Sequence, residues 1–205
     1  INPPTYADGM IFVGLSGGDI QAFNADTLKP LWIYHDALGG QPNCPIIYHD
    51  GYLYTGFWNG EKLDGNFACI SVTDEDQSRA DEEKLASWTY TQKGGFYWAG
   101  AYACDQFILV GTDDGEDGYD KGHSNVLSLD PKTGRVIDQV QLKEVGDLRS
   151  TITREEGTNN YYFTTKGGYF YRLQVNKDGT MVQNSLTALL LDNGSGSSRT
   201  PAMST

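Results

Sequence analysis

The chain lacks the sequence motifs that mark the commonest catalytic sites. No GxSxG, HExxH, P-loop or GxGxxG motif occurs in its 205 residues. Its histidines fall in predicted turns of different segments, so they suggest neither a catalytic triad nor a metal cluster: His35, His49 and His123. The sequence therefore indicates no particular reaction.

Cysteine is also scarce. The chain has 3 cysteines without CxxC spacing, so neither a zinc site nor a disulfide framework is indicated. Cys69 lies in an alternating apolar segment and is expected to be a small buried residue. A bridge between Cys44 and Cys104 stays open at this point.

Basic residues are outnumbered, with 15 Lys and Arg against 27 Asp and Glu and a net charge of −12. This balance argues against a nucleic-acid backbone or an anionic membrane as partner, because both require clustered basic side chains. No apolar run reaches membrane-spanning length, so membrane insertion is not expected. The chain begins at INPPTYADG without Met and ends at SRTPAMST, which suggests a piece of a longer protein.

What the chain does contain is a repeated β pattern. Four short apolar segments follow one another in the same context: DGMIFVG (8–14), DGYLYTG (50–56), DQFILVG (105–111) and TNNYYFT (158–164). Each follows a short β-prone stretch, and each is followed by an alternating segment and then by a turn rich in Asp, Asn, Thr or Gly. The sequence thus predicts a unit of four antiparallel strands that recurs every ~40–55 residues.

Four-stranded units at this spacing predict an all-β fold, a β-propeller of four-stranded antiparallel blades. We expect a single domain over 1–205, with the first strand of a fifth blade at 199–205. A two-sheet sandwich is the main alternative, but it would not require the same unit four times. The expected blades are 2–35, 43–90, 98–141 and 149–190.

Two of the turns carry a recognisable repeat. AFNADTLKPLW (22–32) and SLDPKTGRVID (128–138) resemble the A-x-D-x-x-T-G-x-x-x-W repeat of the quinoprotein dehydrogenase-like (PQQ-like) β-propellers. The resemblance implies that Trp32 and Trp88 pack between neighbouring blades, whereas the third unit has Asp138 in that place. It also implies a larger seven- or eight-bladed ring. The four units would be completed by the missing blades or by a second copy in a homodimer.

In a propeller, the loops between the second and third strands share one face with the connections between blades, and the longest insertions fall there. Such elaborated loops commonly carry function. Aromatic residues on this face could form a platform for a sugar or a peptide, although Phe57 and Trp98 could instead pack between blades. The platform candidates are Phe57, Trp58, Asn59, Phe96, Tyr97 and Trp98.

Two charged features lie on the same predicted face. Arg149 and Arg199 precede the first strands of their units and could form an anion site near the central funnel, or could simply be solvated. An acidic run offers oxygen ligands for Ca²⁺ but lacks the final Glu of an EF-hand loop, so a solvated acidic turn is the alternative. The run contains Asp113, Asp114, Glu116 and Asp117, followed by Asp120. The opposite-face insertion 74–84 is expected to be a solvated loop with one helical turn.

These observations favour a noncatalytic scaffold that binds a protein or a carbohydrate on its loop-rich face. The resemblance implies an extracytoplasmic protein: extracellular, cell-surface or periplasmic. A fragment of a PQQ- and Ca²⁺-dependent quinoprotein dehydrogenase is the alternative. The vicinal cysteine pair of several such enzymes is missing, as is a clear Glu/Asn/Asp ligand set, so we expect no bound PQQ and leave only Ca²⁺ open as a cofactor.

Overall fold

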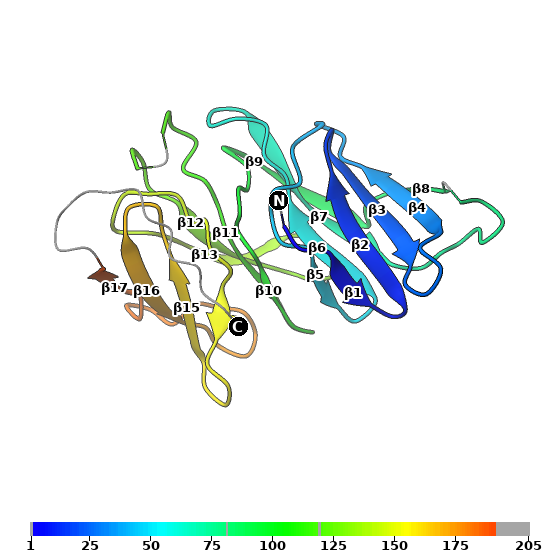
Figure 1. Cartoon of the computed structure of the whole chain (residues 1–205). Helices are drawn as coiled ribbons and strands as arrows, with labels where there is room; N and C mark the ends of the chain where they lie inside the picture. The colour runs from blue at the N-terminus through cyan, green and yellow to red at the C-terminus, as the bar shows by residue number, and fades with distance from the viewer. Residues whose placement is uncertain (1, 81, 119, 192–205) are drawn as a thin grey trace.

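The computed structural model describes residues 2–80, 82–118 and 120–191, and these residues form strands and turns without a helix. Four β-sheets follow one another along the chain and stack side by side (Figure 1). No helix that could span a membrane is found among the described residues. The predicted all-β propeller architecture is confirmed for this part of the chain. The fifth-blade strand predicted at 199–205 lies outside the described residues.

Each sheet contains a meander of four antiparallel strands in chain order, as predicted. The first blade contains β1 (Thr5–Ala7), β2 (Met10–Leu15), β3 (Asp19–Asn24) and β4 (Pro30–His35). The second contains β5 (Ile47–His49), β6 (Tyr52–Gly56), β7 (Asp64–Ser71) and β9 (Trp88–Lys93). The third contains β10 (Tyr102–Ala103), β11 (Ile108–Gly111), β12 (Asn125–Leu129) and β13 (Val136–Gln141). The fourth contains β14 (Thr153–Arg154), β15 (Asn160–Thr164), β16 (Tyr169–Gln174) and β17 (Thr187–Leu190).

The turn between the third and fourth strands has the same geometry in the first and third blades. Asn24 Oδ1 accepts hydrogen bonds from the backbone N–H and the hydroxyl of Thr27, at 2.9 and 3.0 Å. Asp130 Oδ1 does the same with Thr133, at 2.8 and 3.0 Å. An Asx side chain that accepts from the residue three positions later stabilises a turn of this kind. Asn can therefore replace Asp in the repeat without altering the turn.

Hydrophobic clusters fill the space between successive blades, which we call the first, second and third junctions. The residue at the tryptophan position of the repeat, just after this turn, contacts the next blade at each junction. Trp32 is fully buried, and its indole N–H donates to the carbonyl of Val72 in the second blade at 3.2 Å. Trp88 is 9% exposed and donates to the carbonyl of Pro131 in the third blade at 2.8 Å. Both tryptophans therefore pack between blades, as the resemblance implies.

The acidic insertion 74–84 differs from the prediction of a solvated loop with a helical turn. Part of it forms β8 (Glu82–Lys84), which pairs in parallel with β4 and adds a fifth strand to the first blade. The Lys84 side chain is 4% exposed, and its ammonium donates to the Thr73 carbonyl at 2.6 Å and pairs with Glu75 at 3.1 Å. The insertion between β7 and β9 of the second blade therefore crosses to the first blade and joins the two.

The three cysteines are free, so the open question of a Cys44–Cys104 bridge is answered in the negative. Cys44 and Cys69 are buried, the latter as predicted, and Cys104 is half-buried. Burial raises the pKa of both buried thiols to about 12. The interior therefore depends on packing rather than on covalent cross-links.

Candidate functional site

The predicted loop-rich face is assembled by hydrogen bonds between the loops within the blades and the connections that lead from one blade to the next. The N–H of Gly94 donates to Leu63 O at 2.8 Å, and the N–H of Asp113 donates to Gly95 O at 3.1 Å. The N–H of Lys166 donates to Asp147 O at 2.9 Å. Loops that are far apart in the sequence therefore form one continuous surface over the second, third and fourth blades.

Three aromatic side chains on this face lie one against the next in a row, with the first pair tilted at 33° and the second pair stacked. We call this row the aromatic ladder: Trp58, Tyr97 and Trp98. The ring centroids of Trp58 and Tyr97 are 4.9 Å apart, and those of Tyr97 and Trp98 are 4.5 Å apart with planes at 19°. Trp98 is 40% exposed. The sequence placed these three residues on one face, and the structure brings them into contact.

Trp98 is held in a strained backbone conformation, with φ at 57°. A bulky residue in the left-handed region costs energy, and such residues concentrate at binding and catalytic sites. The Lys166 ammonium lies 5.5 Å from the centroid of the Trp98 ring. Trp58 contributes a second unusual feature, because its indole N–H is buried and has no hydrogen-bond partner within the described part of the chain.

The other predicted platform residues do not belong to the ladder. Phe57 and Phe96 are fully buried and pack on Tyr34 and Phe67, at 5.9 and 5.3 Å between ring centroids. For Phe57, the alternative of packing between blades is therefore correct. Asn59 donates to the carbonyl of Asp64 at 2.9 Å and closes its own loop.

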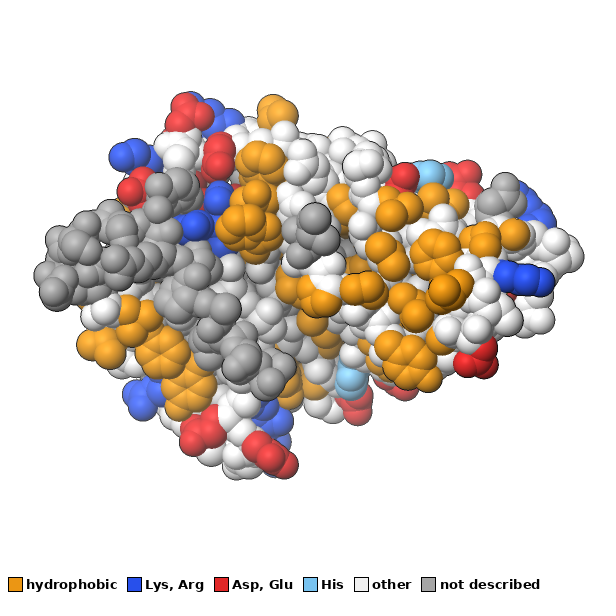
Figure 2. Space-filling view, in the orientation of Figure 1, with side chains coloured by type: hydrophobic (Ala, Val, Ile, Leu, Met, Phe, Trp, Pro, Cys, Tyr) orange, Lys and Arg blue, Asp and Glu red, His pale blue; other side chains and the backbone are white. Residues whose placement is uncertain are grey.

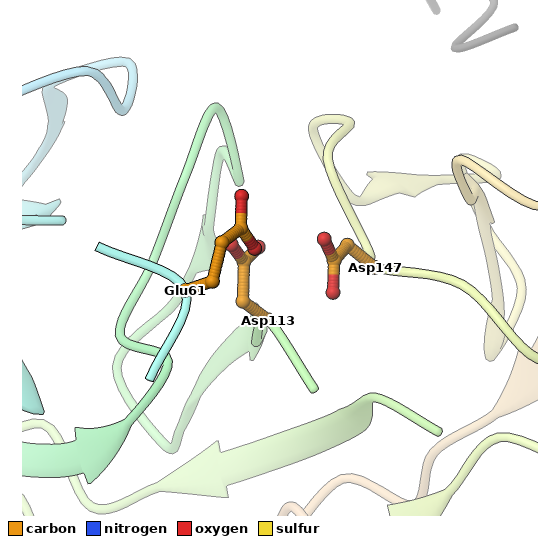
Figure 3. A group of neighbouring side chains, drawn as sticks. All are labelled: Glu61, Asp113 and Asp147. Carbon is orange, nitrogen blue, oxygen red and sulfur yellow. The ribbon is translucent and has the colours of Figure 1, made fainter. Parts of the chain in front are cut away.

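A buried charged cluster lies beside the ladder, where Glu61, Asp113 and Asp147 converge from three separate loops (Figure 3). Arg149 enters this cluster and is 6% exposed, so it is not the solvated arginine that the sequence allowed. Its Nη2 atom lies 2.9 Å from Asp113 Oδ2, 2.6 Å from Asp147 Oδ2 and 3.4 Å from Glu61 Oε2. The guanidinium carbon also lies 4.5 Å from the Tyr97 ring centroid, so the cluster supports the ladder.

The cluster holds more negative charge than one guanidinium can neutralise. Burial raises the pKa of Asp113 well above its ordinary value, and the neighbouring charge of Asp147 adds to this effect. Burial likewise raises the pKa of Asp147 to about 7. Asp147 Oδ2 is close to Arg149 but is not aligned with it for a hydrogen bond. Burial lowers the pKa of Arg149, but Asp113 and Asp147 offset this and raise it overall.

The acidic run that suggested Ca²⁺ ligands is divided by the fold. Only Asp113 points into the cluster, where it is 1% exposed. Asp114 accepts the backbone N–H groups of Glu116 and Gly122, at 2.8 and 2.6 Å, and so shapes its own loop. Asp117 pairs with Lys62 on the surface, and Glu116 is likewise exposed.

Glu61 and Asp147, which complete the cluster, were not among the predicted site residues. Asp147 could have been found from its position two residues before Arg149. Nothing in the sequence around Glu61 marks it. Arg199, the other predicted arginine, lies outside the described residues.

The described cluster does not fit a calcium ion in this arrangement. Three carboxylate oxygens within 4.8 Å of one another are suitable hard ligands. However, the guanidinium of Arg149 already contacts all three carboxylates and acts as their counter-cation. A second cation at the same point would face electrostatic repulsion at short range.

The blades, the Asx turns and the inter-blade tryptophans define a PQQ-like β-propeller repeat fold. The chain matches no protein-family model. It is 26% identical over 144 residues to the outer membrane protein assembly factor BamB of Shewanella oneidensis, an alignment that covers 67% of this chain and 32% of that protein.

Solved structures show the same fold at low sequence identity. BamB from Moraxella catarrhalis has a TM-score of 0.58 at 12% identity and matches 94% of this chain and 60% of its own. A europium-containing methanol dehydrogenase has a TM-score of 0.63 at 13% identity, and the match covers 92% of this chain and 41% of the dehydrogenase. The quinohemoprotein alcohol dehydrogenase of Comamonas testosteroni has a TM-score of 0.61 at 13% identity, and the match covers 88% of this chain and 34% of that enzyme. The chain thus spans between 32% and 60% of the length of these relatives, less than two thirds in each case.

Proposed function

We propose that this protein is a noncatalytic propeller scaffold that binds a protein or a carbohydrate through the aromatic ladder. The observation that supports this proposal is the row of contacting rings ending in Trp98, which stacks on Tyr97, is 40% exposed and has φ at 57°. Rigid aromatic side chains offer a large contact area at a low cost in conformational entropy. The flat face of a sugar ring and the side chains of an extended peptide both match such a surface.

The charged cluster has a positioning role in this proposal. Arg149 is held by carboxylates from two other loops and lies over Tyr97, the central ring of the ladder. Because each loop comes from a different part of the chain, the ion pairs fix the loops relative to one another. The ladder is thereby preorganised, which reduces the entropy lost when a ligand binds.

The proposed location is extracytoplasmic: extracellular, cell-surface or periplasmic. The support is the similarity to a protein named as an outer membrane protein assembly factor, which also favours a protein as partner.

Further propeller blades, from missing parts of the protein or from a second copy, are a second proposed partner. Figure 2 shows hydrophobic side chains across the outer face of the β1–β4 sheet, where Tyr6 is 70% and Leu15 39% exposed. Such a patch is typical of an interaction surface.

The test is a binding screen of the protein against soluble oligosaccharides and extended peptides, monitored by tryptophan fluorescence and NMR. We expect Trp58→Ala and Trp98→Ala to weaken any ligand found by at least ~10-fold, since central aromatic contacts commonly dominate binding energy. Tyr52→Ala is the matched control because Tyr52 is also 40% exposed but lies on the opposite face. A ligand that binds the ladder variants and the native protein equally well would refute the proposal.

The alternative function is that of a quinoprotein dehydrogenase fragment. The fold shared with two dehydrogenases and the converging carboxylates favour it, whereas the position of Arg149 among the carboxylates opposes it. We expect no substrate-dependent dye reduction when the protein is mixed with the quinone, Ca²⁺, a primary alcohol and an artificial electron acceptor. Sustained reduction that Asp113→Asn abolishes would establish the alternative.

A further inference from the structure

A groove on the opposite face of the molecule lies between the third and fourth blades and has a volume of about 710 Å³. Volumes of this size are typical of small-molecule sites. One wall is aromatic: the ring centroids of Tyr102 and Tyr161 are 5.1 Å apart, and those of Phe107 and Tyr161 are 6.2 Å apart. The groove is formed by strand ends and turns on the face opposite the aromatic ladder.

The groove has an unusual charge for this chain. Arg154 and Lys177 line it, and none of its described lining residues is acidic, although the chain as a whole carries a net charge of −12. Three side-chain amides also line the groove: Gln106, Asn159 and Asn176. A local excess of cations and neutral donors favours an anion.

Arg154 is fixed in place, and no carboxylate among the described residues forms an ion pair with it. Its Nε and Nη2 atoms donate to the carbonyl of Thr158, at 3.0 and 2.8 Å, and its Nη1 donates to the hydroxyl of Tyr102 at 3.3 Å. These contacts use three of the five N–H groups of a guanidinium and leave one on Nη1 and one on Nη2. The adjacent acid, Glu155, directs its Oε2 atom to Asn160, Tyr162 and Thr158.

The equivalent groove between the second and third blades shows that these properties are specific to one junction. That groove has a volume of about 460 Å³ and is lined by Asp50 and Asp105, with His49 2.8 Å from Asp105. Its described lining contains one lysine, Lys132, together with these two carboxylates. The repeat therefore places a groove at both junctions, but only the one between the third and fourth blades has a cationic lining.

We propose that the groove between the third and fourth blades binds a small organic carboxylate with an apolar or aromatic body. The carboxylate would accept the two remaining N–H groups of Arg154, because a guanidinium matches a planar carboxylate with two donors. The aromatic wall would pack against the body of the ligand, and the amides would hydrogen-bond to its polar edges. Lys177 would attract the anion toward the opening of the groove.

The test uses phenylacetate as the probe and 2-phenylethanol as its uncharged counterpart, each titrated into the protein and followed by NMR of the backbone amides of 154–161 and 175–177. We expect phenylacetate to bind at least ~10-fold more tightly than the alcohol, since charge-assisted hydrogen bonds are the stronger ones. Arg154→Gln should weaken phenylacetate by ~10-fold or more, whereas Arg135→Gln, an exposed change outside the groove lining, should leave it unchanged.

Equal binding of the two probes, or no change on Arg154→Gln, would overturn the proposal. Lys177→Gln provides a second test if Arg154→Gln does not fold, because Lys177 is exposed. This variant should weaken phenylacetate by a few-fold and leave the alcohol unaffected, and an equal effect on both probes would also count against the proposal. Ladder variants such as Trp98→Ala should not alter phenylacetate binding, so this site and the proposed scaffold function are tested independently.

Discussion

The second and third inter-blade junctions use the same repeat position in two chemically different ways. At the second junction, the Trp88 indole donates to Pro131 O, and its ring lies against Gly134, where an added Cβ would be 2.4 Å from the ring. At the third junction, Asp138 Oδ2 instead accepts the backbone N–H of Met181 at 2.7 Å. Both contacts join the fourth strand of one blade to the following blade.

The two junctions differ in the packing of the side chain at this position more than in the number of its hydrogen bonds. Replacing the indole with a carboxylate keeps one hydrogen bond across the junction but reverses its direction. It cannot replace the apolar area that a tryptophan buries, which is typically ~150–250 Å². Trp88 lines the groove at its own junction, which has a volume of about 460 Å³, whereas Asp138 is not among the described lining residues of the groove of about 710 Å³ at the third junction. The departure from the repeat thus coincides with the larger groove.

The largest expected effect comes from removing the inter-blade tryptophans. Trp32→Ala and Trp88→Ala should each lower the free energy of unfolding by ~3–5 kcal/mol, because each leaves a cavity and loses a buried hydrogen bond. Urea denaturation would measure this. Trp98→Ala, at a side chain that is 40% exposed, is the control and should have a clearly smaller effect. Equal losses in all three variants would contradict the inter-blade role.

A smaller effect is expected at the third junction. Asp138→Ala should lower the free energy of unfolding by ~1–3 kcal/mol, because the N–H of Met181 loses its acceptor while little packing is lost. Asp138→Asn keeps an acceptor oxygen and should cost less. Urea denaturation of both variants beside Trp88→Ala would give the ranking. If Asp138→Ala were as destabilising as Trp88→Ala, hydrogen bonding rather than packing would dominate both junctions.

The smallest expected effect concerns pH and the cluster that positions the ladder. The pKa of Asp147 is about 7 in the folded state, against an ordinary value of 3.8, so the folded protein retains a proton that the unfolded chain releases. This contribution to stability is complete below about pH 4 and is lost as the pH rises to about 7. Its size should be ~1–2 kcal/mol, below the full shift because Asp113 titrates in the same cluster.

Asp147→Asn should reduce this pH dependence. Asp178→Asn, at an exposed turn, is the control and should leave the decrease in the free energy of unfolding between pH 4 and 7 unchanged. Denaturation midpoints measured at several pH values would show the difference. Identical pH profiles for the native protein and Asp147→Asn would mean that Asp147 is ionised in the folded state.

The fold was largely predictable because its determinants are local. Alternation of apolar residues specifies strands, and the Asp-Gly turns before β2 and β6 are visible in the sequence, with φ at 50° and 75° for Asp8 and Gly9. The resemblance to the PQQ-like repeat identified Trp32 directly and Trp88 after the acidic insertion. β8 could not be predicted, because three residues of an acidic insertion become a strand only when β4 offers an unpaired edge.

Local sequence specifies the blades, their turns and the face on which the aromatic residues lie, since each depends on neighbours a few positions away. Which side chains meet on that face depends on how the blades pack. Glu61, Asp113 and Arg149 come from separate loops, and their contacts depend on how blades pack rather than on local pattern. The same holds for the cationic groove, where Tyr102 and Arg154 meet across a junction. Long-range packing sets these contacts, and no short stretch of the chain encodes it.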